Sequence, residues 1–290
     1  MKNKAAVDIG TNSIRMLIGV QNEGKVKVIN QMVEETRLGA GIVGKKLLPE
    51  SIERTIQVLI KYRQVADNYG VSDVCVIATS AVRDAVNQNE FCQKVYCATG
   101  WNVRVLSGEE EAVFAFQGAV SSLSLVSGTP VVVDIGGGST EIIFSTEQGV
   151  KGYSVNIGAV RLKENSLTVQ ELKELLFSSV GGLIGKGEKL SVIGVGGTAT
   201  TAAAIYYGVR KYTRKSIQGK MLFLKDLENM KEDLDNMSLE EKGKVVGLPP
   251  KRADIISPGL QILISVLRLL GADRVIISDA GILDGVILSV

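Results

Sequence analysis

Two short segments place an aspartate at the end of an apolar run and continue into a glycine-containing turn. The first is AAVDIGTNSIRMLIG, residues 5–19, and the second is VVVDIGGGSTEIIF, residues 131–144. Both contain the pattern Asp-Ile-Gly-x-x-Ser, and their aspartates, Asp8 and Asp134, are 126 residues apart (134 minus 8). A unit of strand, turn and strand that occurs twice predicts two similar domains, each with a turn suited to the same chemistry.

The second of these turns predicts phosphate binding. Glycine adopts positive φ at little cost and has no Cβ, so a glycine-rich turn can direct several backbone N–H groups at one anion. A plain hairpin needs a single glycine, whereas this turn has Gly136, Gly137 and Gly138, followed by the hydroxyl of Ser139. The triplet alone fits a structural hairpin equally well.

The carboxylates around the turns suggest a cation. Asp134 ends one apolar run and Glu141 begins the next, while Asp8 holds the matching place in the first copy. Magnesium binds through one or two carboxylates together with water and phosphate oxygens. The alternative is structural, with the same acids paired to Arg15 or Arg83 or to capping N–H groups.

A third glycine turn has a different context. The segment IGVGGTATT, residues 193–201, leads into a helix pattern, so Gly196, Gly197 and Thr198 would lie at a helix N-terminus. Free N–H groups and the helix dipole favour an anion there. The turn lacks the lysine of a Walker A loop, which excludes a P-loop ATPase.

The segment LSGEEEAVFAF, residues 106–116, supplies a candidate base. Ser107 and Glu110 have the spacing of a capping box, which gives Glu110 a structural role. Glu111 has no such explanation. Arg83, in TSAVRDAVN at 79–87, could clamp a terminal phosphate, although a lone arginine is more often a surface ion pair.

The elements that must position these residues alternate between strands and helices. Strand patterns cover 4–9, 14–20, 26–34, 74–80, 103–107 and 190–195, and helix patterns cover 50–69, 88–99 and 168–179. This alternation predicts an α/β protein. The polar stretch SLSLVSGTP at 122–130 is the best junction, so we expect domains at 1–125 and 126–290.

Composition excludes several classes of function. The chain has 33 Lys and Arg against 31 Asp and Glu, a balance of +2 that does not predict nucleic-acid binding. It has no histidine, which excludes a Ser-His-Asp triad and histidine-ligated zinc. No apolar run is long enough to span a membrane, and the start of the chain is not a signal peptide. Three cysteines without metal spacing predict a cytoplasmic protein with reduced thiols.

Together the motifs resemble those of the exopolyphosphatase/guanosine pentaphosphate phosphatase (Ppx/GppA) family, in its short two-domain form. Besides the segments above, ATSAVRDAVN and LPPKRADIISPGLQIL, followed by VIISDAGILDG, occur in the family's order, so the resemblance runs from about residue 4 to 289. It implies two ribonuclease H-like domains of the actin-like ATPase superfold around an interdomain phosphate cleft. It also implies release of terminal phosphate from inorganic polyphosphate, with guanosine pentaphosphate as the alternative substrate.

The resemblance also assigns roles to residues. It implies Glu111 as the catalytic base, Mg²⁺ as cofactor with K⁺ as a further candidate, and Asp8, Asp134 and Glu141 as metal-associated acids. The candidate phosphate-binding residues are Thr11, Asn12, Ser13, Arg15, Arg83, Gly136, Gly137, Gly138, Ser139, Gly196, Gly197 and Thr198.

The chain departs from the family pattern at two motifs. Gln218-Gly219 replaces a frequent His-Gly, and GILDG at 281–285 replaces the common Gly-Leu-Arg-Glu-Gly. The basic stretch RKYTRKSIQGK, residues 210–220, is either a solvated loop or a short track for further phosphates, which would favour short chains. A homodimer would extend such a track. A non-hydrolysing nucleotide sensor and an actin-fold kinase remain the alternative functions.

Overall fold

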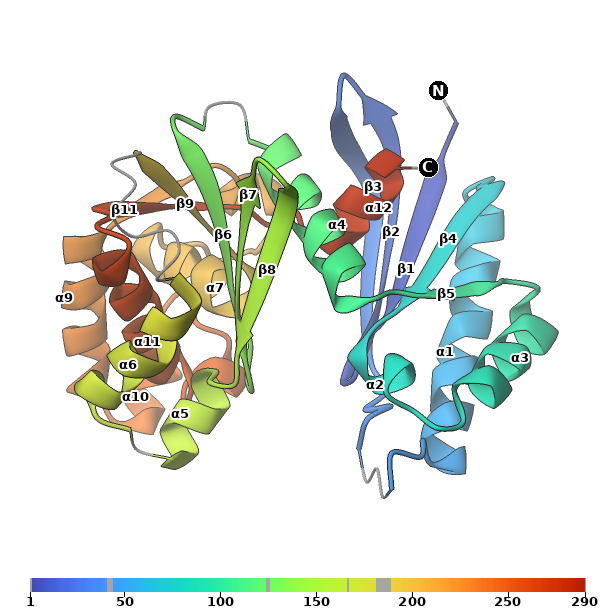
Figure 1. Cartoon of the computed structure of the whole chain (residues 1–290), viewed down its shortest axis with the longest axis horizontal. Coiled ribbons are helices and arrows are strands. Elements are labelled where there is room, and N and C mark those ends of the chain that lie inside the picture. Colours follow the sequence, from blue (N-terminus) through green and yellow to red (C-terminus); the bar gives the residue numbers. More distant parts are fainter. Residues whose placement is uncertain (1, 41–43, 124–125, 166, 181–188, 290) are drawn as a thin grey trace. The chain divides into compact units, whose positions relative to one another are not determined.

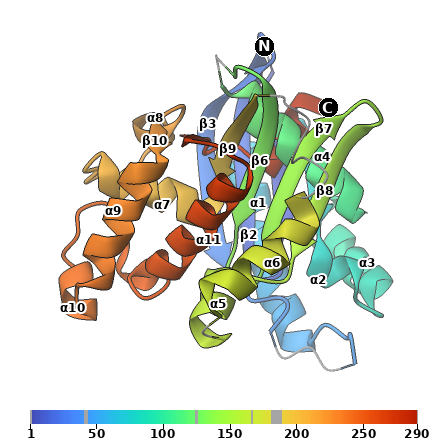
Figure 2. The same cartoon turned by 60° about the vertical axis from the view of Figure 1, so that its left-hand side comes forward.

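The computed structural model of the chain describes residues 2–40, 44–123, 126–165, 167–180 and 189–289. They form two compact units, one of residues 1–121 and 282–290 and the other of residues 122–281. We call them unit 1 and unit 2. Figures 1 and 2 show the elements of each.

Unit 1 is a five-stranded sheet with helices on both faces. The strand order is β3-β2-β1-β4-β5, in which β1, β2 and β3 are antiparallel neighbours and β4 and β5 continue parallel to β1. Its elements are β1 (Lys4–Ile9), β2 (Ser13–Asn22), β3 (Lys25–Glu35), α1 (Pro49–Asn68), β4 (Asp73–Ala78), α2 (Ser80–Arg83), α3 (Gln88–Thr99), β5 (Val103–Val105), α4 (Gly108–Ser121) and α12 (Ile282–Ser289).

Unit 2 repeats this topology in a six-stranded sheet. The order β8-β7-β6-β9-β11 matches the order of unit 1, and β10 is added antiparallel at the edge. Its elements are β6 (Thr129–Ile135), β7 (Thr140–Thr146), β8 (Gly149–Val155), α5 (Ala159–Asn165), α6 (Val169–Val180), β9 (Leu190–Val195), α7 (Gly196–Tyr206), α8 (Arg214–Ile217), β10 (Met221–Phe223), α9 (Leu224–Asp235), α10 (Leu239–Lys242), the 3₁₀ turn η1 (Pro250–Arg252), α11 (Ile256–Leu269) and β11 (Arg274–Ile277).

Three antiparallel strands followed by parallel ones are the arrangement of a ribonuclease H-like domain. The duplication predicted from the sequence is therefore confirmed, and the protein has the two-domain actin-like ATPase fold. The two hairpins correspond residue for residue at the offset of 126. In unit 1 the Gly10 N–H donates to the Ser13 carbonyl at 3.0 Å, and in unit 2 the Gly136 N–H donates to the Ser139 carbonyl at 2.9 Å.

The sheet alternation decides which face each side chain occupies. In β1, Ala5, Val7 and Ile9 are buried in one core together with α1 and α3, while Ala6 packs in the core formed with α4 and α12. Because side chains alternate along a strand, Asp8 has the same parity as Ala6. The strand therefore directs this carboxylate to the face that α4 and α12 cover.

The two units divide the chain differently from the expected 1–125 and 126–290. Residues 124–125, where the boundary was predicted, lie outside the described residues, and the C-terminal helix α12 belongs to unit 1. Its Leu283, Val286 and Ile287 are buried against β1 and α4. Gly285 has no side chain where the helix meets the Phe114 backbone, and a Cβ there would collide with it. This close approach explains the second glycine of GILDG, Gly285.

Among the described residues, no helix combines the length and the apolar character that crossing a membrane requires.

Candidate active site

In unit 1 the first glycine turn carries a neutralised charge. Asp8 and Arg15 are register partners in the β1–β2 hairpin. The Arg15 guanidinium donates twice to Asp8 Oδ2, at 2.6 Å from Nη2 and 3.0 Å from Nε. Asp8 is 1% exposed, and its Oδ1 has no hydrogen-bond partner among the described residues. The structure thus pairs a predicted metal ligand with a predicted phosphate-binding arginine, as in the structural alternative.

In unit 2 the same hairpin positions hold two carboxylates. Asp134 is the register partner of Glu141, which occupies the place of Arg15 at the offset of 126. Glu141 Oε1 accepts hydrogen bonds from Ser139 Oγ at 2.6 Å and from Ser154 Oγ at 3.0 Å. Burial raises the pKa of Glu141, and the neighbouring Asp134 charge raises it further against these hydrogen bonds.

A divalent cation would relieve this arrangement. Two nearby carboxylates, one of them largely desolvated, repel each other when both are ionised. The described residues contain no group of three or more His, Cys, Asp and Glu arranged to hold a metal. Magnesium does not need such a group, because water and phosphate oxygens supply its remaining ligands. Asp134 and Glu141 therefore fit Mg²⁺, whereas Asp8 already has a guanidinium partner.

The structure shows the backbone of the glycine triplet, and phosphate binding by it stays a prediction. None of Gly136, Gly137 and Gly138 has positive φ. The carbonyls of Gly136 and Gly137 accept N–H groups from the start of α5, at 2.9 Å from Ala159 and 2.9 Å from Val160. The close approach is at Gly158, where a Cβ would collide with the Gly136–Gly137 backbone. Because Gly158 has no side chain, the residues just before α5 pack directly against the backbone of this turn.

The third turn does require a left-handed glycine. Gly196 has φ +70°, and a Cβ there would collide with the Asp134 carboxylate. Thr198 Oγ1 donates to the Ile135 carbonyl at 3.2 Å, which fixes the first turn of α7 to the end of β6. The structure therefore brings Asp134 close to Gly196 and Thr198, although Asp134 lies far from these two residues in the sequence. An anion at this helix N-terminus would lie beside the carboxylate pair.

Arg252 joins this site, and we did not predict it from the sequence. Its guanidinium lies against Gly197, since a Cβ on Gly197 would collide with both Nη atoms. Burial lowers the pKa of Arg252, and the nearby Tyr212 and Asp134 oppose that effect. Arg252 belongs to the motif KRADIISPG, which entered the sequence analysis only through the family resemblance. No local pattern distinguishes this arginine, because the turn it reaches lies about 55 residues earlier (252 minus 197).

The predicted base and its arginine meet in unit 1. The capping box is confirmed, with the Glu110 N–H donating to Ser107 Oγ at 3.1 Å and Glu110 Oε2 accepting the Ser107 N–H at 2.9 Å. Glu111, to which the cap gives no role, accepts a hydrogen bond from Arg83 Nη1 at 3.0 Å. Arg83 Nη1 also donates to the Leu106 carbonyl at 3.0 Å. The arginine predicted to clamp phosphate is thus bound to the predicted base.

Both groups of candidate residues lie at the carboxyl ends of parallel strands. In unit 1, β4 ends before Ser80, whose hydroxyl is 3.0 Å from Thr11 Oγ1. In unit 2, β6 and β9 end at the Gly136 and Gly196 turns. Ligand sites of α/β sheets form at this edge because helix N-termini and loops converge there. The carbonyls of Asn12 and Ser13 accept backbone N–H groups at this turn, and phosphate binding by their side chains stays a prediction.

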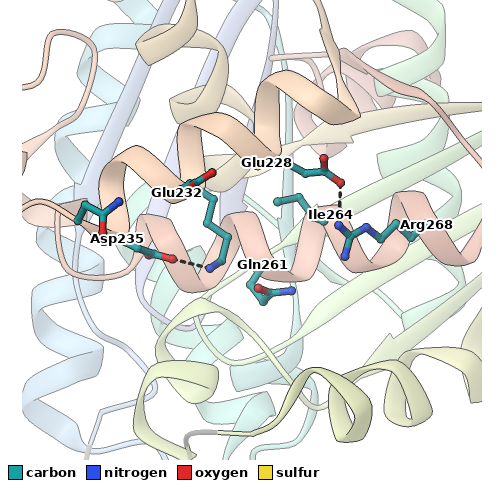
Figure 3. A pocket seen from close by; sticks show the side chains of 8 residues that line it. Glu228, Glu232, Asp235, Gln261, Ile264 and Arg268 are labelled. Carbon is teal, nitrogen blue, oxygen red and sulfur yellow. Dashed lines mark hydrogen bonds and ion pairs between the residues drawn. The ribbon is translucent and has the colours of Figure 1, made fainter.

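A pocket of about 340 Å³ between α9 and α11 does not suit a phosphate. Figure 3 shows Glu228 paired with Arg268, and the ion pair measures 2.7 Å. Lys231 is paired with Asp235 at 2.5 Å. Glu232 adds a further carboxylate to the lining. With three acids against two bases, this pocket would repel a polyanion. None of the predicted phosphate-binding residues lines it.

The two ribonuclease H-like units and the motifs at their turns are those of a phosphatase. The chain belongs to the Ppx/GppA phosphatase family, whose model matches residues 17–290. It is 34% identical to a bifunctional 3-dehydroquinate synthase/phosphatase of Fusobacterium nucleatum over 98% of this chain, and it spans 46% of that protein. It is 31% identical to Exopolyphosphatase 2 of Mycobacterium tuberculosis, over 98% of this chain and 97% of the relative.

Solved structures agree with this assignment. The crystal structure of the Aquifex aeolicus member of the Ppx/GppA family has a TM-score of 0.87 and 32% identity, covering 99% of this chain and 97% of that one. The chain is thus an enzyme of the phosphatase class, as the motifs predicted.

Proposed function

We propose that the protein releases terminal orthophosphate from inorganic polyphosphate in a magnesium-dependent reaction. One observation carries this proposal: unit 2 gathers a pair of carboxylates, a helix N-terminus and a half-buried arginine at one sheet edge. The carboxylates are Asp134 and Glu141, and the anion-binding groups are Gly196–Thr198 and Arg252. A polyphosphate end bound with Mg²⁺ needs both kinds of partner. The name of the Mycobacterium tuberculosis relative supports the same substrate.

In this proposal the groups of unit 2 bind and orient the terminal phosphoryl group. The N–H groups of Gly197 and Thr198 and the Arg252 guanidinium donate to its oxygens. Mg²⁺, held by Asp134 and Glu141, would neutralise charge on those oxygens. Catalysis of phosphoryl transfer consists mostly of such positioning and charge stabilisation.

Glu111 is the proposed base. It accepts a proton from the water whose oxygen attacks the terminal phosphorus. The bridging P–O bond breaks, and the products are orthophosphate and a polyphosphate shorter by one unit. Arg83, bonded to Glu111 at 3.0 Å, keeps the carboxylate in one orientation. The sequence instead predicted that Arg83 clamps a terminal phosphate. The two roles predict different effects of substituting Arg83.

We also propose that short chains are preferred and that the setting is cytoplasmic. The basic stretch at 210–220 is only eleven residues long, which limits the phosphates it can contact. The cysteines Cys75, Cys92 and Cys97 are all free, as expected for a reducing compartment.

The test is phosphate release with Mg²⁺, with and without K⁺, from tripolyphosphate, long-chain polyphosphate, guanosine pentaphosphate and ATP. Glu111→Gln should lose about 10²–10⁴ of the rate. Glu109→Gln is the matched control, because Glu109 is an exposed acid in the same helical turn and should retain activity. Release mainly from guanosine pentaphosphate would change the substrate but keep the mechanism. Near-normal turnover by Glu111→Gln would exclude it as the base.

A further inference from the structure

The basic segment of residues 210–220 reaches the phosphate site of unit 2 through Tyr212, which lies near Arg252. It carries Arg210, Lys211 and Lys215, which are exposed and form no ion pair with another described residue. Lys220 is engaged differently, with its ammonium 4.1 Å from the centre of the Tyr207 ring. Three cationic side chains therefore remain available to a polyanion.

Tyr212, in the middle of this segment, fastens it to the site. Its hydroxyl donates to Asp279 Oδ1 at 2.8 Å, just after β11. The same hydroxyl lies beside Thr200 in the first turn of α7 and near the Arg252 guanidinium. Thr200 Oγ1 in turn donates to the Gly196 carbonyl at 2.8 Å. A single phenol thus hydrogen-bonds Asp279 and lies near both α7 and Arg252, which form the anion-binding site.

The partner of Tyr212 is itself held firmly. Gln218, from the same basic segment, accepts the Asp279 N–H at 2.8 Å and donates to Ser122 Oγ at 2.8 Å. Burial of the hydroxyl, aided by the Asp279 charge, raises the pKa of Tyr212 above its ordinary value, at which the phenol is already a hydrogen-bond donor at neutral pH. The segment is therefore attached to residue 279 at two points, through a side chain and through the backbone.

We infer that Tyr212 is a positioning residue that holds Arg210, Lys211 and Lys215 beside the Arg252 site, where they bind the phosphates of a linear polyphosphate beyond the terminal one. This inference rests on the proposed function. The terminal phosphate is held by Gly196–Thr198 and Arg252, so the segment contributes only to substrates long enough to reach it. Losing Tyr212's hydroxyl should release the segment and weaken binding of long chains selectively.

The experiment compares Tyr212→Phe with Tyr207→Phe in the full chain. Tyr207→Phe also removes one hydroxyl hydrogen bond, to the Met221 carbonyl at 2.7 Å, and it keeps the ring that Lys220 contacts. For Tyr212→Phe we expect KM for long-chain polyphosphate to rise about tenfold, with KM for tripolyphosphate and both kcat values within about twofold of wild type. Tyr207→Phe should match wild type. Equal KM changes for both substrates, or a fall in kcat alone, would overturn the inference.

A second pair of variants keeps the inference testable if Tyr212→Phe fails to fold. The double variant Arg210→Gln/Lys211→Gln alters only exposed side chains, and its control, Lys27→Gln/Lys61→Gln, removes the same charge from unit 1. Only the first should raise KM for long chains. If wild type releases no phosphate, the proposed function fails, and calorimetric titration with long-chain polyphosphate tests the inference alone. Weaker binding by Tyr212→Phe but not Tyr207→Phe would support it, and equal or absent binding would refute it.

Discussion

The contact between Gly196 and Asp134 allows a quantitative test of the unit 2 site through Gly196→Ala. Gly196 has φ +70°, and an alanine in that left-handed conformation costs about 1–2 kcal/mol. Its Cβ would also collide with the Asp134 carboxylate, which has to shift. Overpacking of this kind adds about 1–3 kcal/mol. We therefore expect a loss of about 2–5 kcal/mol from the free energy of unfolding of unit 2.

Gly271→Ala separates the two contributions. Gly271 has φ +62°, nearly the same backbone conformation, and nothing lies within 4 Å of the position of its Cβ. It should lose only the backbone part, about 1–2 kcal/mol. The assay is urea unfolding followed by circular dichroism, with phosphate release measured on the same samples.

The activity of the two variants should differ more than their stability. A shift of about 1 Å in a positioning group can cost about 10²-fold in rate, so Gly196→Ala should lose at least that much. Gly271→Ala should remain active. If Gly196→Ala were no less stable than Gly271→Ala and kept its activity, then Asp134 would not lie against the turn, and the proposed metal pair would fail.

Two further predictions concern charge and capping. Glu141→Gln should raise the melting temperature of the metal-free protein at pH 7. Burial raises the pKa of Glu141, so keeping this carboxylate ionised destabilises the folded state. The gain in melting temperature should vanish as the pH falls towards about 4, the ordinary pKa range of glutamate, because the carboxyl is then protonated in both states. Mg²⁺ should stabilise wild type and the variant Glu147→Gln, whose substituted residue is exposed, but not Glu141→Gln. If the gain in melting temperature of Glu141→Gln increased as the pH was lowered, the upward direction of the Glu141 pKa shift would be wrong. Ser107→Ala should cost unit 1 about 1 kcal/mol in urea unfolding by removing the cap of α4, whereas an unchanged midpoint would show that the capping box contributes nothing.

Local signals made much of the fold predictable. The Asp-Ile-Gly-x-x-Ser pattern identified both hairpins, and the structure gives them the same turn hydrogen bond. The helix pattern at 50–69 became α1, which starts at Pro49. Ser107 and Glu110 form the predicted capping box. Each of these features depends on hydrogen bonds or side-chain periodicity within a few residues, so neighbouring sequence contains the information.

The candidate site was only partly predictable, since the charge partners depend on strand register. Asp8 and Asp134 look alike in sequence, but the register pairs the first with Arg15 and the second with Glu141. The Asp8 charge is therefore paired within its own hairpin, whereas Asp134 faces a second carboxylate, and we propose a divalent cation there. The triplet Gly136–Gly138 was expected to bind phosphate, and the structure adds that none of the three has positive φ and that the close backbone approach falls at Gly158.

The sequence by itself determined the two copies of the hairpin, the succession of strands and helices, and the candidate base Glu111. The tertiary structure alone decided that Arg252 reaches Gly197, that Tyr212 binds Asp279, and that α12 joins unit 1. The physical reason is distance along the chain. Residues 55 to more than 100 positions apart contact each other only after the sheets have formed, and no local preference of either partner encodes that contact.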